Sequence, residues 1–327
     1  MTWITKHTKK DSSIPKTVTM EATGVYHELS AWYLYSRQIK VSVVLPNIAK
    51  RFFESMNLKS KNDYLDAKGL AQMGAERNLD SWEPISEDVA GLRAWTRHYE
   101  TLQESLTQSR NRLEAETHSE YRIAEVEAAT LEQIAFFKKQ CTTAVKSLLK
   151  LVKEDEKLHE LSKLLSSVKG VGELTAAVVI AETNGFLNIA NESQLISYAG
   201  YDVVEHQSGK RAGKTKISKK GNSHIRRGMH MPSLILVSRQ VQPFYDLYLR
   251  VFAKTGIKMK AYVAVQRKLL SILFALAKNK KKFDPNYVSN WQNTKVVENS
   301  EEITLREERG GGFLSATSSA GLVVASC

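Results

Sequence analysis

The sequence predicts an α/β domain at residues 1–85, a long helical segment at 86–165, a mainly helical domain at 166–287 and a disordered tail at 288–327. Three observations lead to this division. Strand-like and helix-like patterns alternate before residue 85, and the next 80 residues contain no proline and a single glycine, Gly91. Basic charge then gathers in one region after residue 206. The length of 327 residues also exceeds that of an ordinary single domain.

The N-terminal domain is predicted from alternating periodicities. Residues 16–20 (KTVTM) form a short apolar strand that ends at Glu21, and residues 39–45 (IKVSVVL) alternate as a second strand. An amphipathic helix is expected between them, from Gly24 to Tyr35, with its apolar surface supplied by Leu29, Trp32, Tyr33 and Leu34. Pro46 ends the second strand and opens a helix, and Asn62 or Asp63 caps another that runs to about Arg77. Strands that alternate with helices indicate a parallel sheet.

The middle segment carries two helical apolar stripes. Steps of three and four residues run from Leu92 to Leu113 and again from Leu131 to Val152. The direct interpretation is a pair of long antiparallel helices that form a coiled coil. An intramolecular bundle without a partner chain fits the same spacing.

The C-terminal domain opens with VKGVGELTAAVVIAET at residues 168–183. The turn Gly170-Val171-Gly172 between two helices is typical of a helix-hairpin-helix, whose backbone N–H groups bind a phosphate at a helix N-terminus. A plain helix–helix turn is the alternative. A loop or hairpin is expected across residues 201–216, followed by further helices.

Basic charge is concentrated in this C-terminal domain. Residues 206–283 hold 19 lysines and arginines against one acid, Asp246, whereas the rest of the chain has 28 basic and 34 acidic residues. Because the excess of basic residues is confined to this region, we expect the ligand to be double-stranded DNA or another polyanion and not a small metabolite. We therefore predict DNA contacts from the turn and from the basic stretch, at Gly170, Gly172, Lys210, Arg211, Lys214, Lys216, Lys219, Lys220, Arg226 and Arg227.

Cysteine usage and hydropathy restrict the compartment. The two cysteines, Cys141 and Cys327, lack zinc-ligand spacing and are too few for a disulfide framework. The N-terminus has no apolar signal-peptide core, and the run at residues 269–277 is too short to span a membrane. These features predict a reducing compartment, either the cytoplasm or the nucleoid.

Three carboxylates are candidates for a metal site. Glu21 follows the first strand, and Asp63 and Asp66 lie three residues apart on one helix face. Oxygen ligands of this kind suit Mg²⁺, which keeps waters and a substrate phosphate as further ligands. The simpler interpretation is a capping Asp63 and a solvated Asp66.

Three serines in the basic stretch are candidate nucleophiles. A serine hydroxyl attacks phosphorus when its proton is removed and the developing charge is neutralised. Ser208, Ser218 and Ser223 all lie among lysines and arginines. Composition alone does not choose between them, and each could equally be an ordinary loop serine that bonds to the backbone.

The ordered motifs resemble those of the insertion-sequence-110 family, the DEDD-type, serine-assisted transposases. The resemblance rests on MEATGVY at residues 20–26, KNDYLDAKGLA at 61–71, the turn segment at 168–182 and the stretch from Ile196 to Ser233. It covers roughly residues 3–287 and keeps the order of the motifs.

The resemblance implies a RuvC-like domain of the RNase H type, a dimerising coiled coil and a C-terminal domain that supplies a nucleophilic serine. Ser208 matches that serine, and Glu21, Asp63 and Asp66 match three of four metal-binding acids. The implied activity is DNA transposition through a serine–DNA bond, with Mg²⁺ as cofactor and a dimer or tetramer as the active form. Some members also use a structured RNA encoded by the element, which is a further partner that the resemblance offers.

The N-terminus departs from the family pattern. The first acid of the family lies on an earlier strand, and Asp11, in a polar turn, is a poor substitute. We therefore expect a RuvC-like domain without its first strands, and impaired activity. Two alternatives follow: a nucleic-acid-binding protein without catalysis, and a metal-dependent nuclease or resolvase that does not use Ser208.

Overall fold

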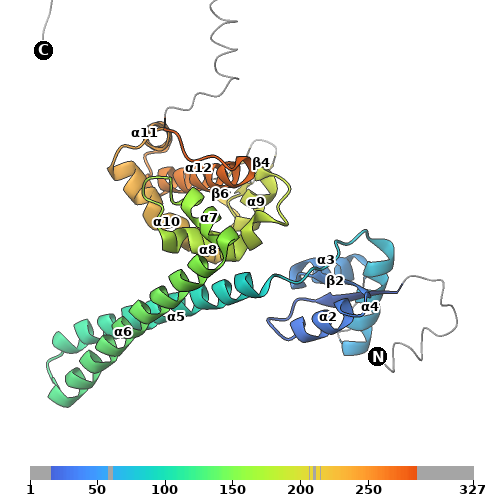
Figure 1. Cartoon of the computed structure of the whole chain (residues 1–327), viewed down its shortest axis with the longest axis horizontal. Helices are drawn as coiled ribbons and strands as arrows, with labels where there is room; N and C mark the ends of the chain where they lie inside the picture. Colours follow the sequence, from blue (N-terminus) through green and yellow to red (C-terminus); the bar gives the residue numbers. More distant parts are fainter. Residues whose placement is uncertain (1–15, 58–61, 206, 209–210, 214, 286–327) are drawn as a thin grey trace, which may run out of the picture. The chain divides into compact units, whose positions relative to one another are not determined.

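The computed structural model describes residues 16–57, 62–205, 207–208, 211–213 and 215–285. The chain is mostly helical and forms two compact units, Met1–Ala90 and Gly91–Cys327 (Figure 1). The tail predicted at 288–327 lies outside the described residues. None of the described helices is long and apolar enough to cross a membrane.

The first unit is built on two parallel strands, as the sequence predicts. Strand β1 (Thr17–Glu21) pairs with β2 (Lys40–Val44), so that Glu21 lies opposite Val44 at the carboxyl end of both strands. Helix α2 (Glu28–Tyr35) connects the two strands. Helices α3 (Pro46–Ser55) and α4 (Asp63–Glu76) follow β2.

The two faces of this small sheet pack against different helices. Val18 and Met20 point to one face, where they pack with Ala31 and Leu34 of α2. Thr19 points to the other face and meets α4 at Gly74, where a Cβ atom would lie 2.1 Å from the threonine Oγ1. Because side chains alternate along a strand, Glu21 shares the α4 face with Thr19.

Helix α2 differs from its prediction in both extent and orientation. It begins at Glu28, after a turn at residues 24–27, and it buries Ala31 and Leu34. Leu29 is 84% exposed, and Trp32 and Tyr33 are also largely exposed. Of the four residues predicted to supply the apolar surface, Leu34 is therefore confirmed and the other three are not, and Ala31 joins Leu34 on the buried side.

The second unit begins with two 31-residue helices, α5 (Glu87–Thr117) and α6 (Ala124–Glu154), which lie side by side in Figure 1. Leu102 of α5 packs with Cys141 and Ala144 of α6, and Trp95 and Tyr99 join this cluster. The predicted antiparallel helix pair is therefore present within one chain.

The remaining helices form the C-terminal part of this unit. Helices α8 and α12 supply more of its buried residues than any other element: Ala176–Thr183 are all buried in α8, and Ala261, Val265 and Leu269 are fully buried in α12. The elements are α7 (Glu156–Leu165), α8 (Glu173–Thr183), η1 (Asn184–Phe186), α9 (Glu192–Ala199), α10 (Ser223–Ser238), α11 (Phe244–Thr255) and α12 (Lys258–Asn279), with four two-residue strands between α9 and α10.

Candidate functional site

Ser208 lies on a β-ribbon between α9 and α10. Strand β3 (Val203–Val204) pairs with β6 (Lys216–Ile217), and inside this pair β4 (Gln207–Ser208) pairs with β5 (Arg211–Ala212). Both pairings are antiparallel, and Ser208 is the register partner of Arg211. The hairpin predicted across residues 201–216 is therefore present, with Ser208 and Arg211 in its inner strand pair.

Backbone hydrogen bonds anchor the base of this ribbon to the helical core. Ser218 N donates to Asp202 O at 2.8 Å, Lys219 N to Gly200 O at 3.1 Å, and Asn222 N to Tyr198 O at 2.7 Å. The two chain segments approach so closely that a Cβ atom on Gly221 would lie 2.4 Å from the Tyr198 carbonyl oxygen. Only glycine permits this approach, which fixes where the ribbon leaves the domain.

The other candidate serines occupy structural positions. Ser218 lies at the base of the ribbon, and its Oγ accepts a hydrogen bond from Lys220 N at 3.3 Å. Ser223 is the first residue of α10, directly after the capping residue Asn222. The fold therefore distinguishes three serines that composition alone left equal.

The predicted DNA-binding cations divide into two groups. Lys216, Lys219 and Lys220 are exposed and, within the described residues, pair with no carboxylate. Arg226 and Arg227 bind to the protein itself. The Arg226 guanidinium donates to the carbonyl oxygens of Ala199, Gly221 and Asn222, and Arg227 lies 3.5 Å from Glu100 and 2.5 Å from Glu104.

Three other cations of the prediction have no described side chain. Lys210 and Lys214 lie outside the described residues, and Arg211 is placed by its backbone in β5. Their contacts with DNA stay predictions.

The predicted turn Gly170-Val171-Gly172 joins α7 to α8. Gly170 has φ +95°, and a Cβ atom on it would lie 3.1 Å from the Ile235 side chain, so this side of the turn packs on α10. A Cβ atom on Gly172 would meet no atom within 4 Å. Gly172 is also the N-cap of α8 without a side-chain hydrogen bond, which leaves the first N–H groups of that helix open to an anion.

The carboxylates of the first unit lie on adjoining elements. Asn62 caps α4 by accepting a hydrogen bond from Leu65 N at 2.8 Å, so Asp63 is not needed as a cap. At about 100° per residue, Asp63 points within about 20° of the direction of Gly74, and Asp66 within about 80°. Gly74 is the point where α4 meets the β1 face that carries Glu21.

These acids have suitable donor chemistry but are not assembled as a metal site. Their oxygen atoms are the ligands that Mg²⁺ prefers. Among the described residues, however, no group of three histidine, cysteine, aspartate or glutamate side chains is close enough to hold a metal ion. The fold therefore brings Glu21, Asp63 and Asp66 to one side of the sheet without forming a three-ligand cage.

Sequence reasoning missed a polar network at the start of α10. Glu182 of α8 is 2% exposed, and Arg97 of α5 donates to both of its oxygens at 2.9 and 3.0 Å. Asn222 Nδ2 donates to the same carboxylate at 2.6 Å, and Tyr198 donates to the Glu182 carbonyl at 3.0 Å. The available signal was one acid in the otherwise apolar run of α8.

A second ion cluster lies beside this network. Glu100 of α5 is 9% exposed and contacts both His224 Nδ1 and Arg227 of α10. Together the two groups join α5 to α10 next to the base of the ribbon. The buried carboxylates therefore fix the start of α10, which directly follows the base of the ribbon.

The contact between α5 and the start of α10 depends on pH, because it requires the charged form of Glu182. Burial alone would raise the pKa of Glu182, but the hydrogen bonds from Arg97 and Asn222 outweigh burial and lower the pKa below its ordinary value. Because the pKa of Glu182 is lower in the folded state than in the unfolded state, where it is near 4.5, the ionised carboxylate stabilises the fold at pH values above 4.5. That contribution is lost as pH falls below 4.5 through the lower folded-state value.

Arg97→Met is expected to destabilise the protein by about 3 kcal/mol at pH 7, because it leaves a buried carboxylate without its cation. In this variant burial raises the Glu182 pKa, so the deficit should shrink as pH falls from 7 toward 5, a range over which the wild-type contribution of Glu182 stays constant. Urea unfolding at pH 7 and pH 5 measures both effects. Arg97→Met/Glu182→Gln is the control and should recover most of the loss; an equal deficit in the double variant contradicts the explanation.

Comparison with known proteins identifies relatives across most of the chain. A profile of the DEDD-type IS110 transposases matches residues 2–117, and the profile of the transposase IS116/IS110/IS902 family matches residues 162–249. The pilin gene-inverting proteins of Moraxella bovis and Moraxella lacunata are each 28% identical over 283 residues, or 86% of this chain and 85% of theirs. A 43.6 kDa protein of insertion element IS110 from Streptomyces coelicolor is 27% identical over 123 residues, or 37% of this chain and 30% of its own.

Proposed function

This chain belongs to the IS116/IS110/IS902 family of transposases, and on that premise we propose that it exchanges DNA strands through a covalent bond between Ser208 and a DNA phosphate. It is an enzyme of DNA recombination. The observation that carries the serine mechanism is the anchored ribbon, which pairs Ser208 with Arg211 in its inner strands. Ser218 and Ser223, by contrast, serve the ribbon base and the start of α10.

The chemical step is a transesterification. The Ser208 oxygen loses its proton and attacks a DNA phosphorus atom, the bond from that phosphorus to a deoxyribose oxygen breaks, and that oxygen takes up a proton and leaves as a hydroxyl. A hydroxyl of another strand then attacks the serine phosphodiester and frees the serine. Cations of the ribbon stabilise the charge that develops on the phosphate oxygens.

Glu21, Asp63 and Asp66 would hold a divalent cation, Mg²⁺, which when bound neutralises phosphate charge and orients the DNA. The placement of α4 against the β1 face supports this assignment. The carboxylates lie in the first unit and Ser208 in the second.

The proposed partners follow from the same features. The open N-terminus of α8 at Gly172 supports binding of a duplex-DNA phosphate through a helix-hairpin-helix. The long α5–α6 pair supports assembly into a dimer or tetramer. Relatives described as pilin gene-inverting proteins suggest inversion of a DNA segment as one outcome. A structured RNA encoded by the element is a further partner in this proposal.

Covalent capture of DNA tests the proposal. The full chain is incubated with labelled DNA that carries element ends, with Mg²⁺ or with EDTA, and protein–DNA adducts are resolved on denaturing gels. We expect an adduct with Mg²⁺ and none with EDTA. Binding without an adduct in either condition would indicate a non-catalytic DNA-binding protein, and cleavage without an adduct would indicate a conventional nuclease.

A further inference from the structure

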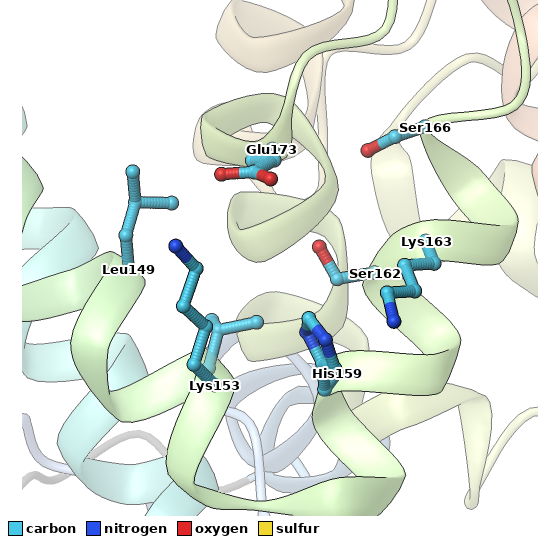
Figure 2. A pocket seen from close by; sticks show the side chains of 8 residues that line it. Leu149, Lys153, His159, Ser162, Lys163, Ser166 and Glu173 are labelled. Carbon is cyan, nitrogen blue, oxygen red and sulfur yellow. The ribbon is translucent and has the colours of Figure 1, made fainter.

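A pocket lies where α6, α7 and the start of α8 meet, close to the Gly170–Gly172 turn (Figure 2). Its volume is about 160 Å³. A cavity needs only about 10–15 Å³ to hold one water, so this pocket has room for a larger guest. Its lining residues are Leu149, Val152, Lys153, His159, Ser162, Lys163, Ser166 and Glu173.

One serine hydroxyl in this pocket is buried without a hydrogen-bond partner among the described residues. It is the Oγ of Ser166, the residue that follows α7. Ser162, one helical turn earlier, is 3% exposed and lines the same pocket. Figure 2 shows both hydroxyls on the side of α7 that faces the start of α8. Because an unpaired buried hydroxyl is costly, the Ser166 hydroxyl indicates a site for a hydrogen-bond acceptor, and the Ser162 hydroxyl lies beside it.

The charges around the pocket favour an anionic acceptor. Lys153 and Lys163 are exposed at its rim, and His159 lies between them in Figure 2. Glu173 is the only acid that lines the pocket, and it is also the first residue of α8. Two ammonium groups against one carboxylate leave a net positive site, and the N-terminus of α8 adds to it.

We propose that this pocket binds one phosphodiester group of a nucleic-acid backbone. The phosphate oxygens accept hydrogen bonds from Ser162 and Ser166 and face the ammonium groups of Lys153 and Lys163. The neighbouring sugar packs on Leu149 and Val152, which form the apolar part of the wall. The inference rests on the proposed function, and it adds a backbone contact beside the Gly172 turn, away from the ribbon.

The test compares two charge-matched double variants of the full chain. Lys153→Gln/Lys163→Gln removes the rim of the pocket, whereas Lys146→Gln/Lys157→Gln removes two exposed lysines from the same helices that do not line it. Affinities for a labelled DNA duplex and for a labelled RNA hairpin are measured by fluorescence anisotropy over a range of salt concentrations. All four lysines are exposed, so both variants should fold.

Lys153→Gln/Lys163→Gln should weaken nucleic-acid binding by about tenfold, because it removes the phosphate contact. The slope of log K against log salt should also become shallower by about one. The matched control should leave the slope unchanged. Ser162→Ala should weaken binding several-fold without changing the slope, because it removes a hydroxyl and no charge.

The two nucleic acids identify the source of the phosphate. An effect confined to the duplex assigns the pocket to DNA, and an effect confined to the hairpin assigns it to RNA. If the pocket variant and its control lose the same affinity and show the same change in salt slope, the proposal that the pocket binds a phosphate is wrong, even if the chain still binds DNA. If the wild-type chain binds neither probe, the proposed function fails first.

Discussion

Ser208→Ala is expected to abolish the covalent protein–DNA adduct and to lower recombination by at least about a thousandfold, because it removes the attacking oxygen. Ser208 lies in the inner strand pair of the ribbon, away from the backbone bonds at its base, so the substitution should leave the fold intact. DNA affinity should therefore stay within about twofold of the wild type, since one neutral hydroxyl contributes little to phosphate binding. Denaturing gels measure the adduct, and anisotropy measures the affinity.

Ser218→Ala is the matched control on the same ribbon. The Ser218 hydroxyl accepts a hydrogen bond from Lys220 N, so its loss should cost about 1 kcal/mol of stability and leave the adduct in place. An adduct that persists in Ser208→Ala and disappears in Ser218→Ala would move the nucleophile to the ribbon base. An adduct that persists in both variants would exclude both serines.

Asp63→Asn and Asp66→Asn should each reduce strand cleavage by about a hundredfold or more while DNA binding is retained. Each change removes one negative ligand from the proposed Mg²⁺ site and keeps the size of the side chain. Helix α4 should still form, because Asn62 provides its cap and the interaction of Asp63 with the helix dipole is worth only about 0.5 kcal/mol. Cleavage of labelled DNA at several Mg²⁺ concentrations measures the effect.

Glu76→Gln provides the control for these aspartates. It removes the same charge from the exposed end of α4, where Glu76 accepts a hydrogen bond from Gln72. Cleavage by this variant should match that of the wild type. A similar loss in all three variants would show that the charge of the helix matters, and would contradict specific ligation by Asp63 and Asp66.

Much of the local structure could be predicted because short-range physics determines it. The alternation in residues 16–20 and 39–45 predicts two strands, and the structure pairs them in parallel as β1 and β2. The stripe of apolar residues after Gly91 predicts two long helices that pack through Leu102, Cys141 and Ala144. The apolar face of α2 was predicted only in part, because a helix of eight residues leaves the periodicity weak: Leu34 is buried as predicted, whereas Leu29, Trp32 and Tyr33 are exposed.

The candidate site was only partly predictable. The acids and the basic stretch stand out by residue type, whereas the roles of Arg226 and Arg227 depend on tertiary partners. Arg226 bonds to carbonyls of the α9–α10 junction, and Arg227 pairs with Glu100 and Glu104 of α5. Contacts between residues far apart in the sequence leave no periodic trace in it, which is also why the Glu182–Arg97 pair, 85 residues apart, was missed.

The sequence by itself determined the order of the units, the family and the two chemical halves, an acidic N-terminal set and a basic C-terminal stretch. Motifs of this kind depend on residue type and spacing, which a chain carries before it folds. Only the tertiary structure decided that Ser208 lies on a ribbon anchored through Gly200 and Gly221, that buried ions join α5 to α10, and that Ser162 and Ser166 line a common pocket. These features depend on burial, which changes the cost of an unpaired charge or hydroxyl and exists only once the helices have packed.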